Sequence, residues 1–93
     1  MFIRVIRLTL LIPGAQTIKD KRQVLQSLMT KLRAKFNISL AESGYQDLWQ
    51  RSELGIAIVG CTQSYLDGVQ QELIEMIEDN YPVEITDTTI ADY

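Results

Sequence analysis

The sequence predicts one α+β domain of the ferredoxin-like kind, and three observations predict it. Apolar residues alternate with polar ones in four short segments, they recur at intervals of three and four in two longer segments, and the order of these segments is βαββαβ. Two split βαβ units usually close as an antiparallel four-stranded sheet in the spatial order 4-1-3-2, with both helices on one face. The 93 residues are enough for one such domain, residues 1–93, with its own core.

The first strand and the first helix have the clearest signals. Residues 2–12 are predicted to form the strand, because apolar side chains alternate there with Arg7 and Thr9. Residues 18–36 are predicted to form the helix, because apolar residues recur on one side of it. Thr17 is the expected N-cap, since an acidic residue follows it at the third position.

The remaining elements follow from the same two periods. Residues 38–41 and 54–61 are predicted as the second and third strands, joined by a polar loop over residues 44–52. Residues 63–80 are predicted as the second helix, which a proline two residues later ends. A β-branched run at residues 83–86 opens the fourth strand. The first and third strands are the most apolar, so we expect them at the centre of the sheet.

The charges are divided unevenly along the chain. All nine Lys and Arg lie between Arg4 and Arg51, together with three acidic residues, whereas residues 52–93 hold nine acidic residues and no basic one. The net charge of −3 therefore conceals a net charge of +6 in the first part and −9 in the second. Such a division indicates either a basic face that attracts polyanions or two charged elements that neutralise each other within the fold.

The first helix carries six cations that are candidates for contact with RNA phosphates. Several lie in its first turns, where the helix dipole disfavours positive charge, so a compensating partner is expected. Ion pairs with the acidic end of the second helix are one alternative, since the two helices should run antiparallel, and solvated surface charge is another. The six cations are Lys19, Lys21, Arg22, Lys31, Arg33 and Lys35.

The composition argues against catalysis and against a bound cofactor. The chain has no histidine, the commonest general base and metal ligand, and its single cysteine cannot form a Cys-x-x-Cys metal site. Cys61 lacks an activating histidine and is expected to be a small buried thiol. The chain has no phosphate-binding glycine loop. An acylphosphatase-like enzyme is the last alternative, but no matching set of Arg and Asn residues is evident, so we expect no enzyme, no metal and no cofactor.

The cellular compartment is predicted from two features. A lone cysteine is typical of a reducing environment, so a cytoplasmic protein is expected. The N-terminal apolar stretch is interrupted by Arg4 and Arg7, which is unlike a membrane span or the core of a signal peptide.

Two surfaces are candidates for partner binding. The first is the loop around Trp49, which either folds back to cap the core or presents an exposed aromatic side chain with amide and guanidinium donors, as interaction hot spots do. Its candidate residues are Asp47, Trp49, Gln50 and Arg51. The second is the sheet face away from the helices, where an uncovered apolar strip favours a homodimer or another partner. Its residues are Ile3, Val5, Leu11, Ala57 and Val59.

Three runs of sequence resemble the YlxP-like family of small bacterial proteins. They are GAQTIKDKR at residues 14–22, NISLAES at 37–43 and QDLWQRSELG at 46–55. Members of that family typically read GA-x-SLKEKR, NVSVAE and QDLWQR-x-x-LG, so the third run matches directly. The other two runs depart from the family pattern conservatively, at Thr17, Ile18, Asp20, Ile38 and Leu40. The resemblance covers nearly the whole chain.

The resemblance implies a ferredoxin-like domain of unknown function, whose genes often lie among those for translation initiation and ribosome maturation. We therefore expect a non-catalytic accessory protein of translation or ribosome assembly, which binds rRNA or a ribosomal subunit through the basic helix and the QDLWQR loop. The alternative is a regulatory or oligomerisation module that binds a protein or a small ligand through its open sheet face. Neither DNA nor a membrane is expected as a partner.

Overall fold

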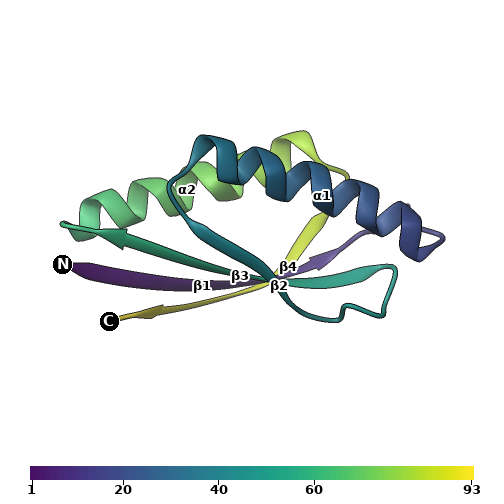
Figure 1. The fold of residues 1–93 in the computed structure, drawn as a ribbon, viewed down its shortest axis with the longest axis horizontal. Coiled ribbons are helices and arrows are strands. Elements are labelled where there is room, and N and C mark those ends of the chain that lie inside the picture. Colours follow the sequence, from purple (N-terminus) through teal and green to yellow (C-terminus); the bar gives the residue numbers. More distant parts are fainter.

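The computed structural model describes all 93 residues and contains the six predicted elements in the predicted order. The strands are β1 (Phe2–Leu11), β2 (Ser39–Gly44), β3 (Arg51–Gly60) and β4 (Glu84–Asp92), and the helices are α1 (Ile18–Lys35) and α2 (Gln63–Asn80). All strand pairs are antiparallel, in the order β2-β3-β1-β4, which reads 4-1-3-2 from the opposite edge. Both helices cover one face of the sheet, and the other face is open (Figure 1).

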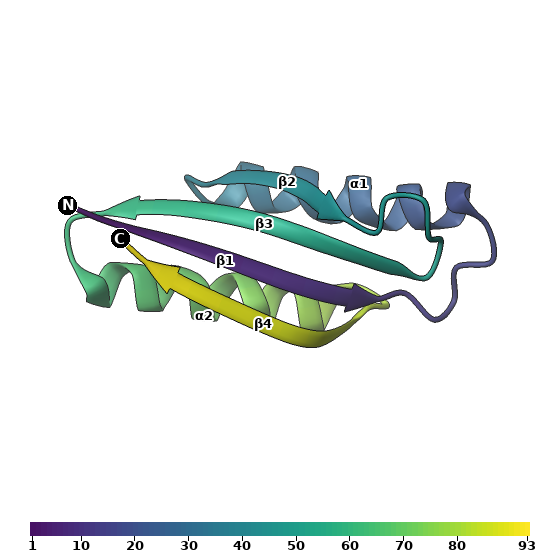
Figure 2. The ribbon, with the colours of Figure 1, turned by 90° about the horizontal axis from the view of Figure 1, so that it is seen from below.

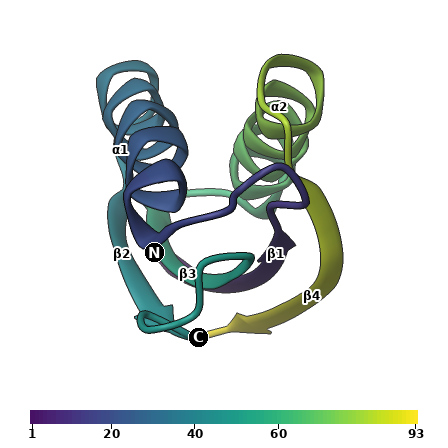
Figure 3. The same cartoon turned by 90° about the vertical axis from the view of Figure 1, so that its right-hand side faces the viewer.

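The core lies between the two helices and the helix-facing residues of the central strands. Figure 2 shows β1 and β3 crossing the middle of the sheet, with β2 and β4 as its edges. Seen end-on, α1 and α2 lie side by side above the sheet (Figure 3). Every second residue of the strands faces the helices and packs against the apolar stripe of each helix, as the two sequence periods predict. The most deeply buried side chains are Ile6, Leu8, Leu10, Leu28, Leu32, Leu54, Ile56, Ile58, Leu66, Leu73 and Ile77.

Several strand boundaries differ from the predictions. β2 continues to Gly44 and β3 begins at Arg51, so the hairpin is longer and its loop shorter than predicted. β4 continues to Asp92, well beyond the β-branched run that opens it. The additional residues are largely polar and most of them are exposed, although Ser52 is buried, so they do not alternate clearly with apolar residues. A register shift in each outer strand pair also interrupts the pattern.

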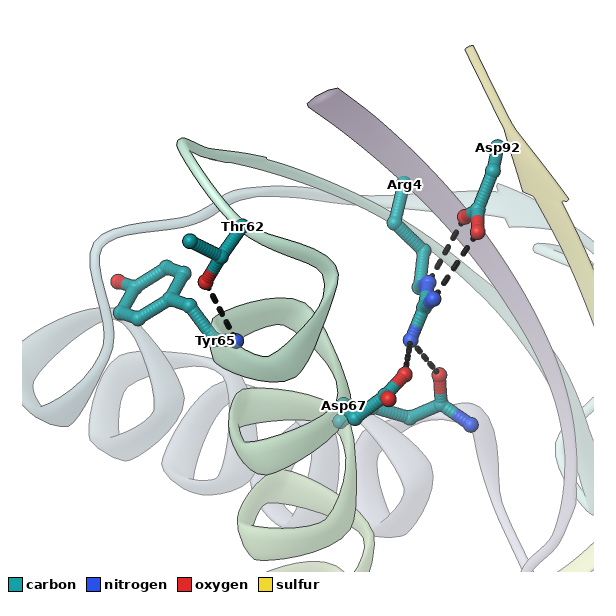
Figure 4. Close-up of polar contacts among 6 residues, drawn as sticks. Arg4, Thr62, Tyr65, Asp67 and Asp92 are labelled. Carbon is teal, nitrogen blue, oxygen red and sulfur yellow. Dashed lines mark hydrogen bonds and ion pairs between the residues drawn. The ribbon is translucent and has the colours of Figure 1, made fainter. Parts of the chain in front are cut away.

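Each helix begins after a threonine cap. The Thr17 hydroxyl accepts a hydrogen bond from the backbone N–H of Asp20 at 3.1 Å, which confirms the predicted N-cap of α1. The Asp20 carboxylate accepts from the N–H of Gln16 at 3.0 Å, one residue before the cap. Thr62 caps α2 in the same way, by accepting from the N–H of Tyr65 at 3.1 Å (Figure 4). The caps fix where each chain segment enters its helix.

One charged side chain lies among the helix-facing residues of β1. Arg4 is only 6% exposed, and it donates two hydrogen bonds to the Asp92 carboxylate of β4, at 2.8 and 2.9 Å. Its Nη1 donates to Asp67 and Gln70 of α2, at 2.7 and 3.0 Å (Figure 4). The hydrogen bond with Asp92, reinforced by that with Asp67, raises the pKa of Arg4 above its usual value. Arg4 in turn lowers the pKa of Asp92.

The predicted ion pairs between the two helices are not formed. The structure has four ion pairs, and none of them joins α1 to α2. Tyr81, which follows α2, instead donates to the carbonyl oxygen of Ser27 at 3.2 Å, and the Lys31 ammonium lies 5.7 Å from its ring centroid. The C-terminal end of α2 therefore lies beside the middle of α1 and not beside its basic start. Neutralisation between the two helices is therefore wrong, although three of the four ion pairs do join a cation of residues 1–51 to an acid of residues 52–93.

Candidate functional site

The loop that joins β2 to β3, residues 45–50, presents three exposed apolar side chains. Trp49 is 52% exposed, Leu48 is 49% exposed and Tyr45 is 42% exposed. Figure 1 shows this loop extending below the end of the sheet, on the side away from the helices. A tryptophan that capped the core would be shielded from water. The exposure of Trp49 therefore favours its interpretation as a contact residue over its interpretation as a cap.

A buried lysine holds this loop. Lys21 of α1 is 1% exposed, and its Nζ donates to the carbonyl oxygens of Tyr45 at 2.7 Å and of Leu48 at 2.6 Å. It also forms an ion pair with the carboxylate of Glu42 in β2 at 3.0 Å. The same carboxylate accepts a hydrogen bond from the Ser52 hydroxyl at 2.7 Å. The prediction that Lys21 contacts phosphate is therefore wrong, because its ammonium group is enclosed and fully occupied within the protein.

A second tether holds the other side of the loop. The side-chain amide of Gln50 donates to the carbonyl oxygen of Ala15 at 2.9 Å. The backbone carbonyl of Gln50 accepts from the N–H of Ile12, also at 2.9 Å. Gln50 was predicted to contact a partner, but its amide nitrogen serves to attach the loop to the segment between β1 and α1.

Tyr45 begins the loop in an unusual backbone conformation. Its φ of 58° makes it the one non-glycine residue of the protein with positive φ, a region that is disfavoured for bulky side chains. Its carbonyl oxygen is held by Lys21, and the guanidinium of Arg51 lies 4.9 Å from its ring centroid. Contacts on the backbone and on the ring together maintain this conformation, as is common where a local structure serves a site.

The predicted loop residues lie together around a shallow hollow of about 440 Å³. It joins the loop to the open face of the sheet, because Leu11 of β1 forms part of its wall. Its side chains combine an aromatic ring, apolar surface and one charge of each sign. The residues that line it are Leu11, Asp47, Leu48, Trp49, Gln50 and Arg51.

The α1 cations other than Lys21 are exposed. Arg33 donates to the carbonyl oxygen of Leu40 at 2.6 Å, so its guanidinium is partly engaged at the β2 edge. Arg22 and Gln46 line one crevice between α1 and the loop, so the basic helix adjoins the loop at its N-terminal end. The cations without a hydrogen bond or ion pair in the structure are Lys19, Arg22, Lys31 and Lys35.

The open face of the sheet is apolar only at the end near the chain termini. Val59 is 55% exposed there, and Tyr93, whose backbone pairs with Ile3, is 75% exposed. Farther along the face, Arg7 and Glu53 form an ion pair at 3.8 Å, and Leu11 lies beyond it, in the wall of the loop hollow. The predicted strip is thus interrupted, and Leu11 belongs to the loop site. The apolar end contains the cross-strand pairs Ile3 with Val59 and Val5 with Ala57.

Cys61, predicted to be buried, is exposed, because it lies in the turn after the last residue of β3. The protein has no group of three or more His, Cys, Asp or Glu side chains that could hold a metal ion. Neither helix is long and apolar enough to cross a membrane. The surface features described above offer aromatic stacking, cationic contacts and apolar packing.

The residues that form the hydrogen-bond network under the loop, Lys21 and its partners, were not predicted from the sequence. Glu42, Tyr45 and Leu48 were not assigned a role, and Lys21 was assigned to the surface. A signal was present, because Lys21 precedes Leu25 by four residues and so lies on the apolar stripe of α1. A lysine at a core position of a helix indicates a buried charge with dedicated partners.

Comparison with known proteins gives a family but no established activity. A family model described as "Protein of unknown function (DUF503)" matches residues 3–90. The "Uncharacterized protein YlxP" of Bacillus subtilis (strain 168) is 39% identical over 72 residues, which cover 77% of each chain.

Two solved structures are similar to this chain. The first is a dimeric ferredoxin-like protein of unknown function from Thermobifida fusca YX. It aligns with a TM-score of 0.55 and 13% identity, over 100% of this chain and 90% of that one. Protein SO0527 from Shewanella oneidensis gives a TM-score of 0.48 and 12% identity, over 97% of this chain and 88% of that one. The likeness to the first shows a common ferredoxin-like fold.

Proposed function

The chain belongs to the YlxP-like DUF503 family, whose function is unknown, and we propose that it is a non-catalytic accessory protein of translation or ribosome assembly that binds RNA. The context of translation comes from the gene neighbourhood that the YlxP-like resemblance implies. The binding surface would combine the exposed cations of α1 with the loop that carries Trp49. Lys21, which the structure buries, has no direct part in it.

The observation that carries this proposal is the half-exposed Trp49 on a loop with tethers on both sides. Proteins that bind single-stranded RNA stack unpaired bases on exposed aromatic rings, and each such base contributes about 1–3 kcal/mol. Arg51 follows Trp49 closely and lies against Tyr45, so a cation is available beside the stacking surface. The rigid attachment of the loop would limit the entropy lost when a base binds.

The exposed cations of α1 support the same function. They extend from Lys19 to Lys35, which is about 24 Å along a helix at 1.5 Å per residue. They are not neutralised by α2, because no ion pair joins the two helices. These cations are spread along and around the helix, and each one that contacts a phosphate can release a counterion, so the net charge of −3 does not exclude local electrostatic binding.

The proposal is tested by ribosome sedimentation and by RNA binding at several salt concentrations. The protein should sediment with a ribosomal fraction, and the double variant Arg22→Gln/Lys31→Gln should bind a single-stranded RNA more weakly. The slope of log affinity against log salt concentration should become less steep by about 0.7 for each lost phosphate contact. Glu78→Gln in α2 is the matched control and should not weaken binding. Absence of both sedimentation and salt-dependent binding would refute the RNA proposal.

A second candidate function is self-association through the open sheet face. The apolar end around Val59 favours it, and so does the dimeric description of the structural relative from Thermobifida fusca. The molecule measures 42 × 21 × 18 Å between Cα atoms, so one whole face of it is comparable in size to the roughly 800 Å² per partner of a standard interface. Val59→Glu, at an exposed position, should convert a dimer into a folded monomer. A wild-type protein that is monomeric by light scattering at high micromolar concentration would exclude this candidate.

A further inference from the structure

We infer that Lys21 is the positioning residue of the loop site: its buried ammonium group holds the backbone from Tyr45 to Leu48 in one shape before any partner binds. The identity of the partner as a single-stranded RNA rests on the function proposed above. The effect of Lys21 on the loop rests on contacts within the protein and can be measured without a partner.

The hydrogen-bond geometry suits a lysine better than an arginine. An ammonium group has three N–H donors around one nitrogen, and Lys21 has three contacts of 3.0 Å or less, to Leu48 at 2.6 Å, Tyr45 at 2.7 Å and Glu42 at 3.0 Å, besides a longer one to the carbonyl oxygen of Gln46 at 3.5 Å. An arginine at this position would place its donors in a flat fork, which does not converge on one point. The number of donors therefore matches the number of close acceptors.

The burial of the Lys21 ammonium group explains why all of its donors have partners. A cation that is 1% exposed must have its charge compensated and its donors bonded, because burial of an unpaired charge is costly. Glu42 supplies the opposite charge, and the Ser52 hydroxyl orients the same carboxylate at 2.7 Å. No buried polar side-chain atom of the protein lacks a hydrogen-bond partner. The site is thus a complete network, and its acceptors include two carbonyl oxygens of the loop.

The conformation of Tyr45 makes the loop depend on this network. Its positive φ is unfavourable for a residue with a bulky side chain, so the loop needs a compensating contact to keep that conformation. Lys21 provides it at the carbonyl oxygen of Tyr45. Without the ammonium group, Tyr45 can relax toward negative φ and turn that carbonyl toward water. The orientation of the following residues, including Trp49, would then no longer be fixed.

Lys21 should therefore affect the affinity for the partner although the partner does not contact it. If the loop is ordered beforehand, the partner does not have to supply the free energy of ordering it. Fixing the backbone of even one residue corresponds to a factor of about 5–30 in an equilibrium constant. Lys21→Met, which keeps an unbranched apolar side chain and removes the ammonium group, should therefore weaken binding of a labelled single-stranded oligouridine about 5- to 30-fold.

The loop itself is tested by amide hydrogen exchange at Leu48, whose N–H donates to the carbonyl oxygen of Tyr45 at 3.1 Å. Lys21→Met should accelerate this exchange on the order of tenfold or more, since the carbonyl oxygen of Leu48 loses its donor and that of Tyr45 loses one of its two donors, which favours local opening. Acrylamide, a neutral quencher, should also quench the fluorescence of Trp49, the single tryptophan, more strongly.

Two control variants separate positioning from charge and from general stability. Lys19→Met removes the same charge from an exposed position of the same helix. Ile77→Val makes a mild truncation in the core of α2, far from the loop in the chain. Both should leave the exchange of Leu48 and the quenching of Trp49 unchanged at temperatures well below unfolding. A merely structural role for Lys21 would make Lys21→Met behave like Ile77→Val.

The outcomes are distinguishable. Unchanged Leu48 exchange in Lys21→Met, or an equal change in Lys19→Met, overturns the inference. Faster exchange in Lys21→Met with no RNA binding by the wild type supports the positioning role and removes the RNA function. If Lys21→Met does not fold, the wild-type ammonium group is observed by NMR: slow proton exchange with water supports the buried network, and exchange as fast as that of exposed lysines overturns it.

Discussion

A buried cation lies near each end of the sheet, Arg4 in β1 and Lys21 in α1, but the two cations bind different kinds of partner. Arg4, near the end where both termini lie, donates to the side chains of Asp92 in β4 and Asp67 in α2. Lys21, near the end with the β2–β3 loop, donates chiefly to backbone carbonyl oxygens of that loop. Figure 1 shows the termini and the loop at opposite ends of the molecule. Arg4 joins elements of the fold, whereas Lys21 shapes a surface.

The chemistry of the two side chains suits these two tasks. The guanidinium of Arg4 is planar and engages the Asp92 carboxylate through two nitrogens while a third reaches α2 (Figure 4). The ammonium of Lys21 is a point charge around which carbonyl oxygens from different residues can gather. A charged residue at a core position of a sequence pattern can therefore either join elements of the fold or hold the backbone of a loop. Its hydrogen-bond partners decide which of the two it does.

The largest expected effect in this comparison is that of Arg4→Met. The variant should lose about 3 kcal/mol of unfolding free energy, because it removes hydrogen bonds to charged groups in two elements at once. Urea unfolding measures the loss, and hydrogen exchange should show that β4 opens first. Arg7→Met, at an exposed position of the same strand, is the control and should cost less than about 1 kcal/mol. A similar small loss in Arg4→Met would mean that Arg4 does not join the elements.

A smaller loss of global stability is expected for Lys21→Met, about 1–2 kcal/mol. The loop can open locally and hydrate its carbonyl groups, which limits the cost of the missing ammonium group. The two buried cations share no hydrogen-bond partner, so the losses in the double variant with Arg4→Met should add to within about 0.5 kcal/mol. Urea unfolding of both single variants and the double variant measures this. A larger coupling energy would show that the two ends of the sheet are not independent.

The order of the elements and their packing could be predicted because apolar periodicity is strong in the central strands and in both helices. Leu8 and Leu10 of β1 and Leu28 and Leu32 of α1 face the core as their spacing indicates. The full length of β4 could not be predicted, since its exposed threonines and acidic residues bond through the backbone and leave no alternation to detect.

The candidate site was predicted less completely than the fold. The polar loop predicted over residues 44–52 is present but shorter, at residues 45–50. The exposure of Trp49 in it agrees with one of the two interpretations of that residue. The supports of the loop are contacts between residues more than twenty positions apart, such as Lys21 with Tyr45, and local spacing carries no information on such partners. The burial of Lys21 was nevertheless indicated by its place on the apolar stripe of α1.

Acid should affect the Arg4 end of the sheet specifically. The hydrogen bond from Arg4 lowers the pKa of Asp92 below its usual 3.8. A carboxyl group whose pKa is lower in the folded state contributes stability above its unfolded pKa and loses it as the pH falls through the folded value. The wild type should therefore lose stability as the pH falls below about 4. Asp92→Asn should show a shallower decline than the wild type in urea unfolding midpoints measured against pH.

The control for this pH dependence is Asp79→Asn, which removes an exposed acidic residue that forms no ion pair. Its decline with acid should match that of the wild type. If Asp92→Asn declines as steeply as the wild type, the bond between Arg4 and Asp92 does not contribute to the acid sensitivity of the fold.

The smallest expected effect comes from a comparison of a buried cation with a surface cation, both of which contact Tyr45 of the β2–β3 loop. Lys21 holds the backbone of Tyr45, while Arg51 lies over its ring at 4.9 Å and is exposed. A cation over an exposed aromatic ring contributes about 0.5–1 kcal/mol, so Arg51→Gln should lower the unfolding free energy by no more than that. A double-mutant cycle with Tyr45→Leu isolates this contribution. Because Lys21 and its carbonyl acceptors are unchanged in Arg51→Gln, the exchange of the Leu48 amide should stay close to that of the wild type. If Arg51→Gln accelerates this exchange as much as Lys21→Met does, the loop is held from its surface, and the distinction between the two cations is wrong.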